Sequence, residues 1–344
     1  MHKVTVQPGG QRFEVPEGET VLAAALRQGV MLPYGCKNGA CGSCKGKIVS
    51  GAVDYGHYHA RVLTETERAH GKALFCQAKP LGDLEIECRT IGAAKDIAVR
   101  ILPCRVQQLT RAADDVMIAQ LKLPANERLQ FLAGQYIDFL LKGGERRSFS
   151  MANPPHGDEF IELHIRHVPG GNFTDHVFAR MKQRDILRLE GPLGSFFLRE
   201  DSAKPIVFVA SGTGFAPIKS IIESALHRNV ARPMTLYWGA RRPKDLYLNA
   251  LPGKWASEHS HFRYIPVISE ARPEDQWTAR SGFVHRAVME DLPDLSAHQV
   301  YACGVPIMVD SAKKDFVSLC QLPEDEFYAD SFTTQADLAS DELR

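Results

Sequence analysis

A glycine-rich stretch that carries three closely spaced cysteines constrains this chain more than any other part of its sequence. The stretch reads Tyr34-Gly-Cys-Lys-Asn-Gly-Ala-Cys-Gly-Ser-Cys-Lys-Gly46, so that Cys36, Cys41 and Cys44 follow the spacing C-x4-C-x2-C. A fourth thiol, Cys76, follows later in the chain. Glycines permit positive φ angles and leave room for backbone N–H groups to approach sulfur atoms. The stretch therefore predicts a loop that wraps around a group bound by sulfur.

Four thiolates at this spacing are typical of a [2Fe-2S] cluster, in which two sulfides bridge two irons. A structural zinc site would more often show two short-spaced Cys or His pairs, whereas Cys76 stands alone. Disulfides suit small secreted chains, and a Rieske centre would need two histidines in place of two cysteines. The predicted cluster ligands are therefore Cys36, Cys41, Cys44 and Cys76.

The composition describes a globular protein without a global charge that would attract a charged partner. The chain has 344 residues and a mass of 38.2 kDa, enough for two or three domains. Its 41 basic and 41 acidic residues give a formal net charge of +0, so we expect neither nucleic acid nor a membrane surface as a partner. We expect a cytoplasmic protein, because no stretch approaches the ~20 apolar residues of a spanning helix and the first residues resemble no signal peptide. The remaining cysteines show no pairing pattern: Cys88, Cys104, Cys303 and Cys320.

Residues 1–92 have the pattern of a small domain with a β-grasp sheet. Apolar and polar residues alternate on both sides of Pro8-Gly-Gly10, which predicts a hairpin. Thr20 is placed to cap a helix over 21–26, and Thr64-Glu-Thr-Glu67 forms a capping box. Further strands are predicted at 47–49, 73–76 and 84–86.

Residues 98–200 have the pattern of an antiparallel β-barrel. A linker without apolar periodicity is predicted over 90–95. Short strands are then predicted at 116–121, 135–140, 161–165 and 186–189, and this spacing suggests a closed barrel. One helix is predicted after Gly170-Gly-Asn-Phe-Thr174.

Residues 204–332 have the pattern of a doubly wound α/β domain. Ile206–Ala210 is a continuous apolar run, typical of a buried parallel strand, and a helix through His227 follows it. Further strands at 234–238, 264–268 and 299–302 alternate with helices at 284–289 and 307–319. The polar tail over 333–344 is predicted to be disordered.

Two stretches of the predicted barrel have residue types that suit a flavin dinucleotide. Arg147-Ser-Phe-Ser150, predicted to lie between two strands, offers a guanidinium for a pyrophosphate, a ring for stacking and a hydroxyl for a ring nitrogen. Gly170 and Gly171 lead into a helix N-terminus, with Thr174 in its first turn, and could hold a second phosphate. Taken alone these signals are weak, and Gly191-Pro-Leu-Gly194 could be a simple turn.

Two strand ends of the predicted α/β domain have residue types that suit a nicotinamide nucleotide. In Ser211-Gly-Thr-Gly-Phe-Ala-Pro217, small residues lie between a buried strand and a helix, where backbone N–H groups can hold phosphates. Cys303-Gly-Val-Pro306 follows another strand end, at the sheet edge where α/β domains bind ligands. A cysteine in this position is more often a packed thiol than a participant in chemistry.

Taken in order, these stretches resemble the ferredoxin-NADP reductase superfamily, in its bacterial form with an N-terminal [2Fe-2S] domain. The resemblance covers nearly the whole chain up to Phe332 and implies three domains: a ferredoxin domain, an FAD-binding β-barrel and an NAD(P)-binding α/β domain. Several stretches are similar to those of the CDP-6-deoxy-Δ3,4-glucoseen reductases within the superfamily: Tyr34–Lys45, Leu132–Asp138, Arg146–Asn153, Gly212–Ser220 and Gly282–His285.

The resemblance also implies roles for individual residues. Arg147 matches the arginine on the flavin pyrophosphate, and Phe149 matches the stacking ring, for which the family usually has Tyr. Ser150 matches the hydroxyl near flavin N5, and Cys303 matches the thiol beside the nicotinamide, so these two are the candidate catalytic residues. Phe332 resembles the aromatic residue that covers the other face of the flavin. The residues that match the nucleotide-binding loops are Gly212, Thr213, Gly214 and Gly304.

The activity that the resemblance implies is an electron relay. NAD(P)H gives a hydride to FAD, and FAD passes single electrons to the cluster and then to a partner enzyme. In the glucoseen reductases, the implied partner is a pyridoxamine-phosphate dehydrase that holds a CDP-hexose intermediate. One alternative is the reductase component of an oxygenase, which would use the same three domains. Another is a redox sensor, which the flavin and nucleotide motifs disfavour.

Two finer expectations concern the ends of the relay. NADH is favoured over NADPH, because Gly239-Ala-Arg-Arg242 offers no dedicated cationic pocket for a 2′-phosphate. The small side chains of the cysteine loop predict a cluster close to solvent, where Lys37, Lys45 and Lys47 would meet an acidic partner. Lysines that serve only solubility are the alternative explanation.

Overall fold

The computed structural model describes residues 1–92 and 97–333. Their contacts divide the chain into two compact units, and each is described here by itself. Among the described residues, the first unit consists of 1–92 and 97, the short segment Gly194–Phe196 and 331–333, and the second consists of Ala98–Leu193 and Phe197–Asp330. Residues 93–96 of the predicted linker region and nearly all of the predicted tail lie outside the described residues. The boundaries of the three predicted domains remain predictions.

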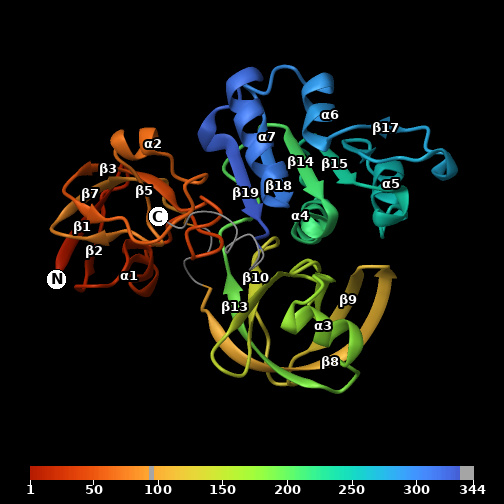
Figure 1. Cartoon of the computed structure of the whole chain (residues 1–344), viewed down its shortest axis with the longest axis horizontal. Coiled ribbons are helices and arrows are strands. Elements are labelled where there is room, and N and C mark those ends of the chain that lie inside the picture. The colour runs from red at the N-terminus through yellow and green to blue at the C-terminus, as the bar shows by residue number, and fades with distance from the viewer. Residues whose placement is uncertain (93–96, 334–344) are drawn as a thin grey trace. The chain divides into compact units, whose positions relative to one another are not determined.

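The first unit contains a mixed five-stranded sheet of the β-grasp type (Figure 1). Its elements are β1 (His2–Gln7), β2 (Gln11–Val15), α1 (Val21–Arg27), β3 (Lys45–Ser50), β4 (Val53–Asp54), α2 (Glu65–Ala69), β5 (Lys72–Leu74), β6 (Lys79–Pro80) and β7 (Leu84–Glu87). The sheet order is β2-β1-β7-β3-β5, while β4 and β6 pair separately. β1 and β2 form the predicted antiparallel hairpin, and β1 also pairs in parallel with β7.

Local sequence signals set the helix starts in this unit. The Thr20 hydroxyl accepts a hydrogen bond from the Ala23 backbone N–H at 3.3 Å and caps α1. Thr64 and Glu67 form the predicted capping box at α2. The strand predicted at 73–76 ends earlier, at Leu74, because the chain turns there with hydrogen bonds back to the Leu74 carbonyl. Cys76 consequently lies in a turn, and not in a strand.

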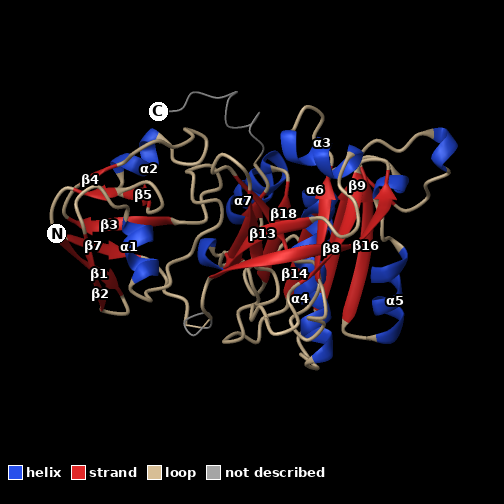
Figure 2. Ribbon diagram, turned by 90° about the horizontal axis from the view of Figure 1, so that it is seen from below, coloured by secondary structure: helices blue, strands red, loops and turns tan. Residues whose placement is uncertain are grey.

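In the second unit, six antiparallel strands form the predicted barrel (Figure 2). These strands are β8 (Arg100–Ala113), β9 (Val116–Lys122), β10 (Tyr136–Leu140), β11 (Arg146–Ser150), β12 (Ile161–Arg166) and β13 (Ile186–Leu193). The sheet order is β11-β10-β13-β8-β9-β12. The two edge strands meet where Met151 bridges to Leu163 and the Ala152 backbone N–H donates to the Glu162 carbonyl at 2.7 Å, so the sheet closes on itself.

Two barrel predictions were wrong in detail. Arg147–Ser150 does not connect two strands, because it lies in β11, where it pairs with β10. Gly191–Gly194 is not a simple turn either, since β13 continues to Leu193. A Cβ atom on Gly191 would lie 2.7 Å from the Ile137 side chain of the neighbouring strand, so close strand packing explains this glycine. The predicted helix is present as α3 (Asn172–Ala179).

The rest of the second unit is a doubly wound α/β fold. Its strands are β14 (Ile206–Ser211), β15 (Met234–Ala240), β16 (Phe262–Ile268), β17 (Arg280–Ser281), β18 (Gln299–Gly304) and β19 (Phe327–Ser331). The sheet order is β17-β16-β15-β14-β18-β19, and the pairs from β17 to β18 are parallel. The helices are α4 (Phe215–His227), α5 (Ala250–Glu258), α6 (Val284–Asp291) and α7 (Pro306–Leu319), of which α5 was not predicted.

Adjacent residues of β15 show that helices cover both faces of this sheet. Tyr237 belongs to a buried cluster with Val288 of α6 and Phe316 of α7. The next residue, Trp238, stacks on Phe215 of α4 with ring centroids 3.9 Å apart. Successive side chains of a strand point to opposite faces, so α6 and α7 lie on one face and α4 on the other. The strand order reverses between β14 and β18, which makes their carboxyl ends the expected ligand-binding edge.

Among the helices that the structure describes, none is both long and apolar enough to cross a lipid bilayer.

Candidate cluster, flavin and nucleotide sites

The four predicted cluster ligands come together in the first unit as two hydrogen-bonded pairs. Cys36 bonds with Cys41, and Cys44 bonds with Cys76. Two pairs fit a binuclear cluster in which each iron takes two thiolates.

Within each pair, the hydrogen bond favours the thiolate form of the accepting cysteine and raises the pKa of the donating one, Cys36 or Cys44. The hydrogen bond from Cys36 lowers the pKa of Cys41 to about 6, and the one from Cys44 lowers the pKa of Cys76. The Cys36 backbone N–H also donates to the Cys41 Sγ atom at 3.3 Å. The Gly39 backbone N–H donates to the Cys76 thiol. The loop therefore supplies the N–H groups that the sequence predicted for a sulfur-bound group.

Glycines give the cysteine loop its shape. Gly39 has a φ of +78°, and a Cβ atom there would lie 2.7 Å from the His57 carbonyl. Gly42 has a φ of +75°, and a Cβ atom on it would lie 2.9 Å from the Val62 side chain. Both observations confirm the predicted need for positive φ angles. Gly46 has a different role, because it lies in β3 and its missing side chain makes room for the Phe75 ring.

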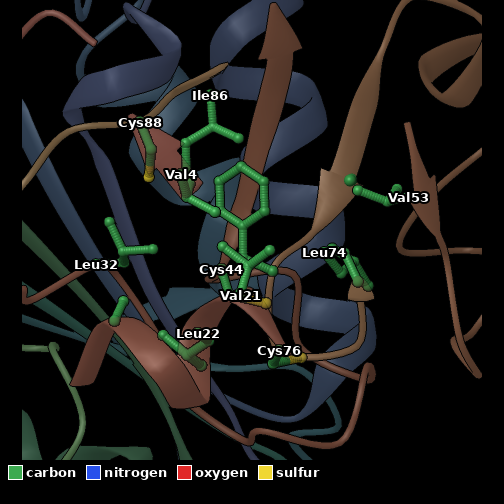
Figure 3. Close-up of a cluster of buried hydrophobic side chains, with 14 of the residues drawn as sticks. Val4, Val21, Leu22, Leu32, Cys44, Val53, Leu74, Cys76, Ile86 and Cys88 are labelled. Atoms are coloured by element: carbon green, nitrogen blue, oxygen red, sulfur yellow. The ribbon is translucent and has the colours of Figure 1, made fainter. Parts of the chain in front are cut away.

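The two cysteine pairs differ in their exposure to solvent. Cys44 and Cys76 lie among the apolar side chains of the first unit's core (Figure 3) and are 3% and 6% exposed. Cys36 and Cys41 are partly exposed. One side of the cluster site therefore reaches the surface of this unit, as predicted.

The lysines predicted beside the cluster are not equivalent. Lys37 is exposed, and its ammonium lies 4.9 Å from the centre of the Tyr34 ring. Lys47 is also exposed. Lys45, by contrast, is largely buried and forms an ion pair with Glu67 at 2.6 Å. Lys45 stabilises the domain locally, so its expected place in a docking surface is wrong.

The predicted flavin-binding residues Arg147 and Phe149 lie on one face of β11, next to the start of α3. The Phe149 ring lies 5.5 Å from that of Phe173, in the first turn of α3, and 5.9 Å from that of Phe139. The Arg147 guanidinium bonds to Glu145 at 2.9 Å. The strand thus places an aromatic ring beside a helix N-terminus and carries a cation two residues before it, a combination that suits a flavin with its pyrophosphate.

The Gly170-Gly171 turn leaves the first backbone N–H groups of α3 without a side-chain cap. Gly170 has a φ of +80°, and a Cβ atom on Gly171 would lie 2.8 Å from the Thr174 hydroxyl. Thr174 is engaged within the loop, because its hydroxyl donates to the Val168 carbonyl at 2.9 Å. Thr174 therefore shapes the turn, while the backbone N–H groups are the part suited to a phosphate.

The two predicted nucleotide stretches touch at the switch point of the sheet. β14 ends at Ser211, the 3₁₀ turn η1 (Gly212–Gly214) follows, and α4 begins without a side-chain cap. A Cβ atom on Gly214 would lie 2.1 Å from the Cys303 carbonyl, and one on Gly304 would lie 2.0 Å from the Ser211 hydroxyl. Only glycine fits at these positions, so the loop and the end of β18 form one continuous backbone surface.

Asp330 connects the two predicted catalytic residues, and sequence analysis did not identify it. The Ser150 hydroxyl donates to the Asp330 carboxylate at 3.5 Å. Burial raises the pKa of Cys303 well above its ordinary value, and the charge of Asp330 adds to this rise, so Cys303 is a neutral thiol. An acidic residue in the last strand, two positions before Phe332, was the available signal.

Two further aromatic residues belong to this region, one found in the structure and one predicted. Trp238, which sequence analysis did not single out, donates its Nε1–H to the Gly212 carbonyl at 3.0 Å and so holds the nucleotide loop. Phe332 follows β19 and is partly buried. Its role against the flavin remains a prediction.

Comparison with known proteins gives the same three parts in the same order. Residues 4–81 match the family described as 2Fe-2S iron-sulfur cluster binding domain. Residues 103–198 match the oxidoreductase FAD-binding domain, and residues 208–314 match the oxidoreductase NAD-binding domain.

Several relatives are similar over their whole length. A protein of Yersinia pseudotuberculosis serotype I (strain IP32953), named CDP-6-deoxy-L-threo-D-glycero-4-hexulose-3-dehydrase reductase, is 40% identical over 96% of this chain and 98% of its own. Terephthalate 1,2-dioxygenase, reductase component 2, of Comamonas sp is 37% identical over 97% of this chain and 98% of its own. The solved structure of an Amycolatopsis cytochrome P450 reductase has a TM-score of 0.76 and 36% identity, and covers 97% of this chain and 99% of that one. The chain therefore belongs to the ferredoxin-NADP reductase superfamily and is an NAD(P)H-dependent [2Fe-2S] flavoprotein reductase.

Proposed function

We propose that this reductase passes electrons from NADH to a dehydrase that acts on a CDP-linked deoxyhexulose. The observation that carries the proposal is the 40% identity, over nearly the whole of both chains, to the Yersinia reductase named for such a dehydrase. A cytoplasmic location is part of the proposal and agrees with eight free cysteines, of which four are not cluster ligands.

The proposed site residues divide the work between binding and proton control. FAD supplies the step between a two-electron donor and a one-electron acceptor. Arg147 and the N-terminus of α3 hold its pyrophosphate, and the backbone N–H groups of Gly212–Gly214 hold the phosphates of the nicotinamide nucleotide. Ser150 keeps its hydroxyl proton directed at Asp330, which fixes the orientation of that hydroxyl. Four cysteine thiolates hold one cluster per chain, and each chain also binds one FAD.

Charge near the end of β15 supports NADH as the donor. In doubly wound folds, residues just after the second strand meet the ribose of the adenosine. Arg242 follows β15, but its guanidinium bonds to both carboxylate oxygens of Asp275 at 2.7 Å and to Glu274 at 3.4 Å. A guanidinium that already binds two carboxylates is poorly placed to hold a 2′-phosphate.

The alternative acceptor is the oxygenase of a multicomponent system, because two relatives with 36–37% identity are named as the reductase components of oxygenases. Reconstitution distinguishes the two. The purified reductase with NADH, a pyridoxamine-phosphate dehydrase and its CDP-hexulose substrate should consume NADH in proportion to the deoxygenated sugar formed. A terephthalate-type oxygenase component serves as the comparison. Turnover with the oxygenase alone would refute the dehydrase proposal while leaving the reductase activity intact.

A further inference from the structure

Tyr247 borders the proposed nicotinamide site and has no role in the relay described so far. Its ring makes edge contacts with Trp238, at 5.3 Å, and with Phe215, the first residue of α4, at 6.4 Å. Its hydroxyl lies within electrostatic range of the Cys303 thiol. The residue as a whole is partly exposed. Tyr247 is therefore an aromatic residue at the switch point of the sheet, with part of its surface open to a ligand.

A chain of hydrogen bonds reaches the Tyr247 hydroxyl from the barrel. The hydroxyl lies 2.8 Å from Nδ1 of His164, in β12. The other ring nitrogen, Nε2, lies 3.2 Å from a carboxylate oxygen of Glu162. Two more donors surround that carboxylate: the Lys219 ammonium of α4 at 3.2 Å and the Gln120 amide at 3.4 Å.

The donors around Glu162 determine where each proton lies. Although burial opposes ionisation, the hydrogen bond from His164 and the charge of Lys219 lower the pKa of Glu162 to about 2, so this carboxylate can only accept. Burial lowers the pKa of His164, which is therefore a neutral ring. A neutral ring carries one N–H, and it must point to Glu162. Nδ1 is then an acceptor, and the Tyr247 hydroxyl must donate to it.

With its proton committed to His164, the Tyr247 oxygen can only accept a further hydrogen bond. In the part of the chain that the structure describes, no other donor to this oxygen is present. We propose that Tyr247 is a specificity-determining residue that accepts a hydrogen bond from the carboxamide NH₂ of the nicotinamide. This inference rests on the proposed function and on the expected position of the nicotinamide beside Cys303.

An analogue without the amide hydrogens tests the inference. In 3-acetylpyridine adenine dinucleotide a methyl group replaces the NH₂, so the donor is lost while the ring and the carbonyl remain. The rate of flavin reduction by each reduced nucleotide is measured by stopped-flow spectroscopy of the FAD- and cluster-loaded protein. Calorimetry with the two oxidised nucleotides measures their affinities independently of turnover. The preference is the ratio of the value for NADH to the value for the acetyl analogue. Comparing this ratio between wild type and variant cancels the intrinsic difference between the two nucleotides.

The Tyr247→Phe variant keeps the ring and loses the acceptor. A neutral hydrogen bond is worth about 0.5–1.5 kcal/mol, so the preference for the carboxamide nucleotide should fall about 3- to 10-fold in rate, in affinity or in both. Tyr264→Phe is the matched control, because it removes a tyrosine hydroxyl of the same unit, one that bonds to Asn249 at 2.7 Å. The control should retain the wild-type preference. An unchanged preference in Tyr247→Phe would overturn the inference.

A second variant tests the orientation of the proton. Glu162→Leu leaves the Tyr247 hydroxyl in place but removes the acceptor that fixes the His164 tautomer, so the preference should fall in this variant as well. If Tyr247 acted only by packing, Glu162→Leu would keep the wild-type preference, which would also overturn the inference. If NADH did not reduce the flavin of the wild-type protein, that result would instead refute the proposed function.

Discussion

Two cysteines of the first unit, Cys41 and Cys88, lie in opposite surroundings. Hydrogen bonds lower the pKa of Cys41 to about 6, whereas burial raises the pKa of Cys88 to about 12. In Figure 3, Cys88 lies apart from Cys44 and Cys76. Hydrogen bonds thus favour the thiolate form of Cys41, whereas burial favours the thiol form of Cys88.

Changing Cys41→Ser should remove the cluster and leave the flavin in place. Reduction of cytochrome c, which needs single electrons from the cluster, should fall to background, while ferricyanide reduction, which flavin alone supports, should continue. Iron and sulfide content, visible absorption and the two assays measure these outcomes. The matched control, Cys88→Ala, should keep the cluster. If both activities fell together in Cys41→Ser with FAD still bound, the order of the relay would be wrong.

The pairing of Arg242 makes the nucleotide preference testable at single residues. The wild-type protein should have a higher kcat/KM for NADH than for NADPH. The double variant Glu274→Gln/Asp275→Asn frees the Arg242 guanidinium, so kcat/KM for NADPH should rise about tenfold, in line with one charge-assisted hydrogen bond to phosphate. Steady-state kinetics with ferricyanide and each nucleotide give these values. A wild-type preference for NADPH would contradict the proposal.

At the scale of the elements, Gly304 shows how closely β14 and β18 approach. It has a φ of +145°, and a Cβ atom would lie 2.0 Å from the Ser211 hydroxyl and 2.9 Å from the Ser211 carbonyl. Gly304→Ala should destabilise the second unit by about 1–3 kcal/mol, because side chains rarely adopt this φ and the strand ends must separate. The same substitution should slow the reduction of the flavin by NADH.

The control for this prediction is a glycine in open space. Gly253 lies inside α5, and nothing lies within 4 Å of its Cβ position. Gly253→Ala should stabilise the protein by about 0.5–1 kcal/mol through helix propensity, without a change in NADH kinetics. Thermal denaturation of the two variants should therefore shift in opposite directions. If Gly304→Ala left the thermal stability unchanged, the two strand ends would not be rigidly packed against each other.

The elements that sequence analysis predicted are those with local signals. Thr20 and the Thr64 capping box start helices through contacts three residues away. The polar sequence of β11 gives no alternation to detect, and this strand exists because it pairs with β10. α5 contains Pro252 and Gly253, which sequence rules count against a helix.

The same distinction holds for the candidate site. Spacing within one loop predicted the cysteine ligands, and a strand–loop–helix pattern predicted the Gly212–Gly214 turn. Asp330 could not be found in this way, since it meets Ser150 across 180 positions of the chain. The ion pair of Lys45 with Glu67 was equally hidden, because it depends on where α2 packs.

For the molecule as a whole, the main question is how a protein without net charge meets its electron acceptor. The net charge of +0 provides no long-range steering, so the partner must recognise a local patch. Exposed cations lie close to the partly exposed cysteine pair. Lys37 is next to Cys36, and the exposed Arg61 places its guanidinium 3.5 Å from the carbonyl of Ala40, next to Cys41. We expect a partner with carboxylates to dock there.

The last prediction is that Lys37→Glu/Arg61→Glu slows reduction of the purified partner at low salt. Raising the ionic strength from 0.01 to 0.1 M shortens the Debye length from about 30 to about 10 Å, so wild-type rates should fall with salt, whereas the variant should respond weakly or in the opposite sense. The control, Lys3→Glu/Arg12→Glu, makes the same charge change on β1 and β2. These strands are separated in the sheet from β3, into which the cysteine loop leads. The control should behave as wild type, and cluster absorption should be intact in both. Equal partner rates across salt and across both variants would mean that these cations serve only solubility.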